Sequence, residues 1–115
     1  MFISHVDSIK SIPIKMDGLQ GVEKQTLIGP DEGWKDHVMR LFTVEEGGFT
    51  PRHAHPWPHI NYITKGKGTL FLAGKKYPLI PGSVAYIPAG EQHQFMNTSQ
   101  DDFSFMCIVP KEGDK

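Results

Sequence analysis

The chain has 115 residues, a length that fits one domain, residues 1–115. Its 38% apolar and 22% charged residues exclude the disordered class, and its net charge of −1 lacks the basic excess of nucleic-acid-binding proteins. No segment approaches the ~20 apolar residues of a membrane-spanning helix, and no secretory signal precedes residue 15. We therefore expect a cytoplasmic protein with neither a nucleic-acid nor a membrane partner.

Short runs of strand-forming residues alternate with turn residues along the chain, which contains 12 Gly and 9 Pro. In chain order, the predicted strands are residues 25–28, 38–44, 60–64, 69–73, 77–80, 83–87, 94–96 and 103–109. We expect turns at 45–48 and 81–82, a tight hairpin at 74–76, and a frayed tail at 111–115. No helical period of useful length occurs, so the pattern predicts an all-β antiparallel sandwich or barrel.

Four histidines form the strongest chemical signal in the sequence. His53, His55 and His59 fall within seven residues, and His93 follows later in the chain. In one extended strand, the first three would point to the same face, and a neighbouring strand could add His93. Neutral imidazoles bind Mn, Fe, Co, Ni, Cu and Zn, although an HxH pair alone more often marks surface or structural histidines than a metal site. His5 and His37 lack such a context and are expected at the surface.

Glycines and a proline stand at fixed distances around these histidines. Gly47 is followed after five residues by His53, then by His55, His59 and, six residues later, Gly66. Downstream, Gly82 is followed after five residues by Pro88, then Gly90, His93 and Asn97. These segments resemble the two cupin motifs, G(x)5HxH(x)3-4E(x)6G and G(x)5PxG(x)2H(x)3N. The single departure in residue type is His59, where the family usually has Glu.

The resemblance is to small single-domain (type 2) metal-binding cupins, with core motifs at 47–66 and 82–97. It implies a double-stranded antiparallel β-barrel, a jelly roll. It also implies one divalent metal ion on His53, His55, His59 and His93, with manganese or iron preferred over zinc, nickel, cobalt or copper. Glu91 is not expected to be a ligand. The motif glycines and Pro88 are expected in turns, and Asn97 is expected to cap one.

Four neutral imidazoles would leave the metal its full positive charge, which strengthens a Lewis acid and attracts anions. The missing Glu also removes a candidate base. The resemblance suggests metal-dependent chemistry of dioxygenase, decarboxylase, isomerase or lyase type on a small anionic or oxygenated molecule. A non-catalytic, metal-dependent sensor or binding module is the alternative, so enzyme status is open. We also expect a homodimer formed through sheet edges and terminal strands.

Three residues are predicted to contact the small molecule. Arg40 interrupts an apolar run and needs a partner, either a rim salt bridge or an anionic ligand. Trp57 is expected to line the mouth of the site or to serve packing, and Asn61 shares the parity of the histidines. Cys107 is predicted to be a core residue, with a role in function as the lesser alternative.

Overall fold

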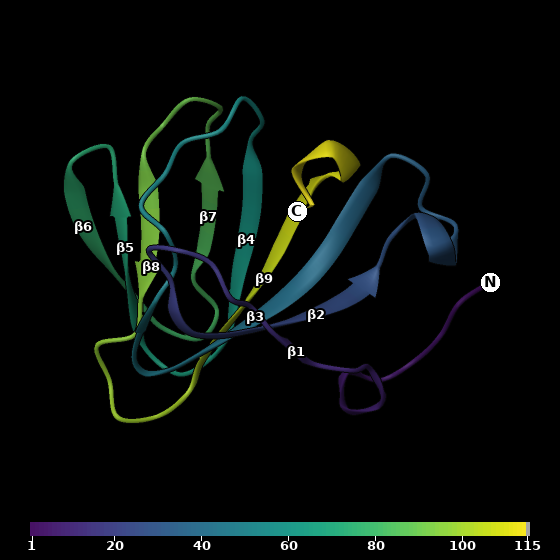
Figure 1. Ribbon diagram of the computed structural model, residues 1–115, viewed down its shortest axis with the longest axis horizontal. Helices are drawn as coiled ribbons and strands as arrows, with labels where there is room; N and C mark the ends of the chain where they lie inside the picture. Colours follow the sequence, from purple (N-terminus) through teal and green to yellow (C-terminus); the bar gives the residue numbers. More distant parts are fainter. Residues whose placement is uncertain (115) are drawn as a thin grey trace.

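Antiparallel strands make up most of the computed structural model, which describes residues 1–114 (Figure 1). The strands are β1 (Ile12–Pro13), β2 (Gln20–Ile28), β3 (His37–Phe49), β4 (His59–Lys65), β5 (Gly68–Leu72), β6 (Lys75–Leu79), β7 (Val84–Ile87), β8 (His93–Met96) and β9 (Phe103–Pro110). Three short 3-10 helices are η1 (Val6–Ser8), η2 (Pro30–Glu32) and η3 (Lys111–Gly113). In the described residues no helix is long enough to cross a membrane. The all-β prediction is confirmed.

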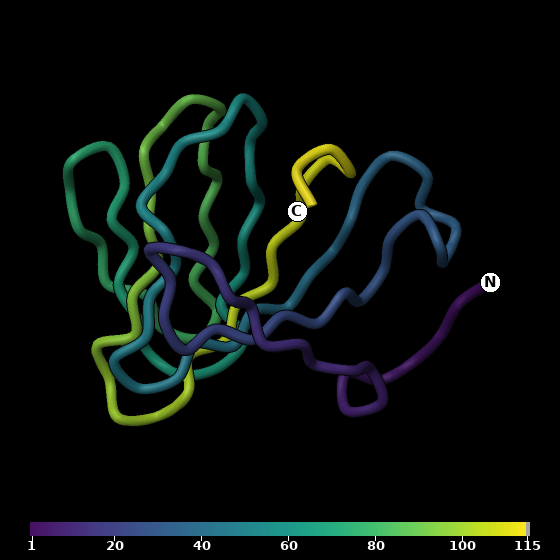
Figure 2. The backbone as a smooth tube through the Cα atoms, viewed as in Figure 1, coloured from purple at the N-terminus to yellow at the C-terminus, as the bar shows by residue number. Residues whose placement is uncertain are grey.

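All strands join in one curled sheet, ordered β6-β5-β8-β3-β9-β4-β7, with β2 on β3 and β1 on β2. The long strand β3 pairs with β2, β8 and β9, so it connects both halves of the sheet. The hydrophobic core lies inside the curl, where it includes Phe103, Phe105 and Ile87. The hairpin β5–β6 and the N-terminus lie at opposite ends of the longest axis (Figure 2). This arrangement confirms the jelly-roll prediction.

The predicted turn at 45–48 is wrong, because β3 continues to Phe49. Gly47 has a φ of +75°, and the pairing with β2 shifts register between Gln20 and Val22. A Cβ on Gly48 would lie 2.6 Å from the carbonyl oxygen of Gln20. The two glycines therefore form a β-bulge that bends the strand without ending it.

The other differences lie at the ends of elements. Most strands begin one residue or more before the predicted start, and β1 was not predicted. The β5–β6 turn is centred on Ala73 and Gly74, with φ angles of +50° and +84°, one residue earlier than expected.

The tail predicted to be frayed forms η3 instead, and Asp114 makes a hydrogen-bonded ion pair with Lys24 at 2.6 Å. This pair holds the end of the described chain against β2. Lys115 lies outside the described residues.

Candidate metal centre

Two of the four histidines lie at the starts of strands and two lie in a loop. His59 begins β4 and His93 begins β8, whereas His53 and His55 lie in the loop before β4. The prediction of one extended strand through all three upstream histidines is therefore wrong for the first two. Prolines at 51, 56 and 58 interrupt this stretch, and proline lacks the N–H that a strand ladder needs.

Backbone hydrogen bonds fix the loop against β8. The N–H of His53 donates to the carbonyl of His93 at 3.1 Å, and the N–H of His93 donates back at 2.9 Å. The N–H of Gly90 donates to the carbonyl of His55 at 2.8 Å. The Pro88–Gly90 turn thus both leads into His93, as predicted, and anchors the loop that carries His55.

These elements bring the four imidazoles together inside one end of the barrel. Neighbouring ring centroids are 4.3–4.9 Å apart. Candidate ligand atoms of His53, His55 and His93 all lie within 4.8 Å of one another. His59 extends this group, because its Nε2 lies 2.9 Å from Nδ1 of His55. The predicted cluster is present, and the ligand role of each member stays a prediction.

His93 provides the test of whether this cluster fits a metal ion. Its Nδ1 lies 2.9 Å from the carbonyl oxygen of Glu91, which can only accept, so Nδ1 carries the hydrogen. The lone pair is then on Nε2, which is buried and has no hydrogen-bond partner within residues 1–114. A buried, unpartnered imidazole nitrogen costs free energy unless something fills the space before it. A divalent ion bound by this nitrogen and by the neighbouring imidazoles would fill that space.

The cluster is held in its neutral form. Burial, followed by the nearby histidines and Arg40, lowers the pKa of His59 to about 3 and that of His55 to about 4. Burial also lowers the pKa values of His53 and His93. Neutral imidazoles are the form that binds metals, so the site is ready for a cation near neutral pH.

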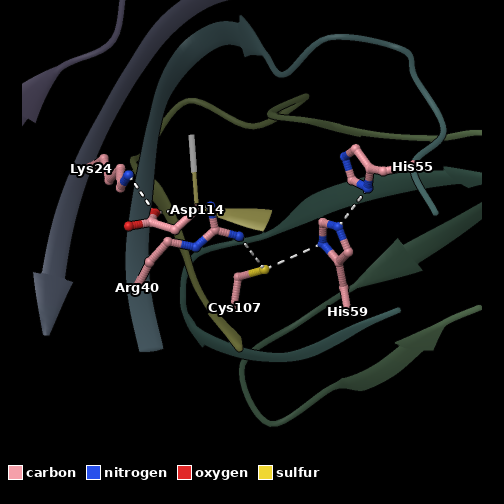
Figure 3. Close-up of polar contacts among 6 residues, drawn as sticks. All are labelled: Lys24, Arg40, His55, His59, Cys107 and Asp114. Carbon is pink, nitrogen blue, oxygen red and sulfur yellow. Dashed lines mark hydrogen bonds and ion pairs between the residues drawn. The ribbon is translucent and has the colours of Figure 1, made fainter. Parts of the chain in front are cut away.

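Behind His59, a chain of polar contacts runs across the neighbouring strands β4, β9, β3 and β2 (Figure 3). Nδ1 of His59 lies 3.3 Å from Sγ of Cys107, and an NH2 group of Arg40 donates to the same sulfur at 3.1 Å. The other terminal nitrogen of the Arg40 guanidinium lies 3.6 Å from the carboxylate of Asp114, and this carboxylate also contacts Lys24. Burial raises the pKa of the Cys107 thiol, although Arg40 opposes this effect.

A cavity of about 400 Å³ opens beside the histidines. Apart from them, its polar side chains within the described residues are Arg40, Thr50, Trp57 and Cys107, and the rest of its wall is mainly apolar. The apolar lining includes Ile14, Met16, Leu19, Phe42, Phe95 and Phe105. No Asp or Glu side chain lines the cavity in this part of the chain.

The three residues predicted to contact a small molecule occupy different positions. Arg40 is buried, lines the cavity and lies 3.6 Å from the carboxylate of Asp114, so it has an ion-pair partner. Its contact with an anionic ligand stays a prediction. Trp57 lines the cavity and stacks on His55 with ring centroids 5.0 Å apart. Asn61 is only 1% exposed, is absent from the cavity lining, and donates to the carbonyl of Met106. It lies behind the site, and its contact with a ligand stays a prediction.

The remaining expectations concern supporting residues. Asn97 caps its turn as predicted: its side-chain oxygen accepts from the N–H of Ser99 at 2.9 Å, and its amide donates to Val44 and Asp101 carbonyls. His5 is exposed, whereas His37 is half-buried and stacks on Trp34, so the surface prediction is only partly right for His37. The sequence reasoning missed the roles of Asp114 and of the Cys107 contacts. The inward parity of Arg40 and Cys107 on paired strands was the available signal.

Comparisons with known proteins identify the family of this chain. The Cupin domain family matches residues 40–109, more than half of the chain. Auxin-binding protein 1 of Arabidopsis thaliana is 30% identical over 116 residues, which cover 92% of this chain and 59% of that protein. The chain spans about half the length of the curated relatives it matches.

Solved structures give the same result for the fold. A polyketide cyclase from Streptomyces resistomycificus superposes with a TM-score of 0.90 at 28% identity, covering 96% of this chain and 79% of that one. A predicted oxalate decarboxylase from Thermotoga maritima gives a TM-score of 0.86 at 26% identity, covering 95% and 98%. With the family match and both motifs in place around the histidine cluster, the chain belongs to the cupin superfamily.

Proposed function

We propose that this chain binds one divalent metal ion on His53, His55, His59 and His93 and acts on a small molecule with an apolar body and an anionic oxygen-donor head. The observation that carries the proposal is the buried Nε2 of His93, which has no hydrogen-bond partner within residues 1–114 and lies among three other imidazoles. Manganese or iron is the preferred ion, with zinc, nickel, cobalt and copper as alternatives.

The side chains of the cavity support the chemical class of the small molecule. Its wall is mainly apolar and aromatic, which favours a ring or branched hydrocarbon body over a sugar. Arg40 presents a buried guanidinium to the same space, and this group would bind a carboxylate. Trp57 and the neighbouring loop residues Ala54 and Pro56 form part of the cavity wall.

The reaction class follows from what the lining provides. A bound ion would supply a Lewis acid with uncompensated positive charge, because the four imidazoles are neutral. No carboxylate in the described residues lines the cavity, so these residues place no carboxylate base beside the ion. We therefore favour chemistry that depends on acidifying or polarising the substrate, as in isomerisation, cyclisation or decarboxylation. Cyclase and decarboxylase are names borne by similar structures.

A metal-dependent binding module is the second candidate. The same lack of a carboxylate base favours it, as does similarity to a protein named for binding auxin. Both candidates share one site and differ only in turnover.

The test starts with the metal content of the purified protein, measured by elemental mass spectrometry.

The chain is then loaded with each metal and incubated with phenylpyruvate in D2O, and exchange of the benzylic hydrogens is followed by NMR. A 1,2-diketone, a hydroxy acid, a catechol and a uronate complete the panel, with oxygen uptake as a second readout. We expect exchange above the metal-only background in wild type and in a His37→Ala control, and its loss in His93→Ala. Tight binding of the panel without turnover would favour the binding module, and no metal uptake by wild type would overturn the proposal.

A further inference from the structure

The short helix η3 and the residue after it, Asp114, close one side of the cavity. Gly113 belongs to the cavity wall and packs on the indole of Trp57, so closely that a Cβ atom on this glycine would lie 2.6 Å from Nε1. The carboxylate of Asp114 lies 3.6 Å from the guanidinium of Arg40 (Figure 3). Trp57 and Arg40 both line the cavity, so η3 and Asp114 cover two parts of its wall.

Few interactions hold η3 in this position. Within residues 1–114, its one backbone hydrogen bond to the rest of the chain joins the N–H of Lys111 to the carbonyl of Asp36, at 3.0 Å. The N–H of Asp114 donates to the carbonyl of Lys111, so this bond moves with the helix. None of the residues of η3 is buried, and none carries an apolar side chain. Hydrophobic burial therefore does not fix η3 to the barrel, and such segments open at low cost.

The side chain of Asp114 is the main attachment of this segment. It forms an ion pair with Lys24 at 2.6 Å, in which the two side chains are 23% and 19% exposed. Water screens a pair that it reaches, and holding two side chains in one geometry opposes the pairing, so the attachment is weak. Arg40 keeps its hydrogen bond to Cys107 when Asp114 moves away. Opening would thus leave the rest of the cavity wall in place.

We propose that residues 111–114 form a lid, hinged where β9 ends, that must open before a molecule with a ring-sized body can reach the histidines. Only the identity of that molecule rests on the proposed function. The lid closes over the empty and the occupied cavity alike, so it controls the rates at which a neutral ligand enters and leaves. An anionic ligand also competes with Asp114 for Arg40 and thereby favours the open state.

Cys107 makes the lid measurable independently of any ligand. It is the only cysteine of the chain, it is buried, and it lines the cavity. Two neutral reagents modify it in the full chain as purified: the small methyl methanethiosulfonate and the aromatic 4,4′-dithiodipyridine, which releases UV-absorbing 4-thiopyridone. A lid slows the aromatic reagent much more than the small one, whereas a change in the thiol itself alters both rates equally. The ratio of the two rates is therefore the readout.

Gly113→Ala is the main variant, because its Cβ forces η3 and Trp57 apart without changing any charge. We expect it to raise the aromatic reagent's rate about 10-fold or more and the small reagent's less than about 2-fold, as an open state populated at about 10% or less becomes the major one. Lys24→Gln removes one end of the ion pair and should act in the same direction. The controls, exposed Glu112→Ala in the same helix and exposed Lys35→Gln with the same charge change, should match wild type.

Dependence on urea separates opening of the lid from unfolding of the barrel, and far-UV circular dichroism checks that each variant is folded. In wild type, the aromatic reagent's rate should change little at low urea, because opening of four residues exposes little surface. A steep dependence that matches global unfolding would overturn the proposal. Wild-type rates in both Gly113→Ala and Lys24→Gln would also overturn it, as would equal acceleration of the two reagents.

A second measurement connects the lid to the ligand. In stopped-flow binding of a neutral 1,2-diketone, Gly113→Ala should raise the association and dissociation rates by the same factor and leave the dissociation constant unchanged. An unchanged association rate would overturn the lid. If the diketone and the acids of the panel do not bind while the thiol rates change as expected, the lid is supported and the proposed function is wrong.

Discussion

The Sγ atom of Cys107 lies 3.3 Å from Nδ1 of His59, on the side of the imidazole that faces away from the other histidines. The sulfur also accepts a hydrogen bond from Arg40. In metal sites, a partner on the second ring nitrogen fixes the tautomer and the ring plane of a ligating histidine. Cys107 is thus placed to orient His59 with its Nε2 toward the cluster.

Replacing Cys107 by Ala should weaken metal binding, because His59 then loses the partner of its Nδ1. We expect about a 10-fold loss of affinity, in line with other outer-shell partners of metal ligands. The unfolding free energy should fall by about 1–3 kcal/mol, since Arg40 also loses a buried acceptor. Chelator competition and urea denaturation measure the two effects.

Cys107→Ser is the matched variant, because its hydroxyl can still accept from Arg40 and contact His59. It should recover most of the affinity lost in Cys107→Ala. Equal affinities for the Ala variant and wild type would show that the sulfur does not orient His59.

His59 is the position where this chain departs from the usual cupin motif, and its substitution tests the four-histidine site. His59→Ala should weaken metal affinity strongly, because one of four bonds is lost. His59→Glu should restore binding, since Glu is the usual residue at that position of the motif, and its negative charge should reduce affinity for anionic ligands.

The competition titration distinguishes the alternatives for this position. If His59→Ala binds metal as tightly as wild type, the site uses only His53, His55 and His93, the three whose ligand atoms lie within 4.8 Å of one another. If His59→Glu stays folded but does not bind, the carboxylate does not fit this barrel.

The sequence predicted the fold well because local patterns of alternating and turn residues indicate where the strands lie. Alternating residues in β9 face the core on one side, and turn residues separate the strands. The path of β3 through Gly47 and Gly48 was missed, since a glycine pair is compatible with both a turn and a bulge. Only the pairing with Gln20 on β2 decides between them.

The candidate site was predicted only in part: the histidines were found, but the polar contacts behind them were missed. The histidines were found because they keep fixed distances from glycines and prolines that form turns. The polar chain behind them was not, because its contacts join residues far apart: Arg40 and Cys107 are separated by 67 positions, and Lys24 and Asp114 by 90. Such pairs follow from the register of the sheet, which no local pattern specifies.

The apo protein should lose stability as the pH falls from about 6.5 toward 3. Burial lowers the pKa of His59 to about 3 and that of His55 to about 4, whereas both titrate near 6.5 in the unfolded chain. Between these values the unfolded state binds protons that the native state does not, so unfolding becomes easier. The contribution is complete above pH 6.5.

We expect a loss of about 2 kcal/mol between pH 7 and 4.5 from these groups, less than the full shifts imply, because the His55 ring is partly exposed. Thermal unfolding across this range measures it. His59→Gln should flatten the dependence, whereas the same change at exposed His5 should not. Parallel curves for wild type and His59→Gln would contradict the burial effect.

Gly48 is expected to be intolerant of any side chain, because an added Cβ would lie 2.6 Å from the Gln20 carbonyl and 2.8 Å from Val44. Gly48→Ala should cost about 2–3 kcal/mol by urea denaturation. Gly47→Asn is the control: its φ of +75° suits Asn, and no atom of the described residues lies within 4 Å of its Cβ position. Its cost should stay below about 1 kcal/mol. Equal stability of Gly48→Ala and wild type would refute the bulge constraint.

Asp114 is expected to compete with an anionic ligand for Arg40. Its carboxylate lies 3.6 Å from the guanidinium and 2.6 Å from Lys24, and the preceding Gly113 lines the cavity. Asp114→Asn removes that negative charge, so a bound carboxylate no longer has to displace or face it. The affinity of the metal-loaded protein for phenylpyruvate, measured by calorimetry, should rise about 3- to 10-fold.

Asp36→Asn makes the same change in net charge at an exposed position and should leave the affinity nearly unchanged. A neutral 1,2-diketone of similar size should bind wild type and Asp114→Asn equally, because it carries no charge for Arg40 to bind. If both Asn variants gain affinity equally, the effect comes from net charge alone. If the neutral ligand gains as much as the acid, the gain does not depend on the charge of the ligand, and Arg40 does not act as the anion site.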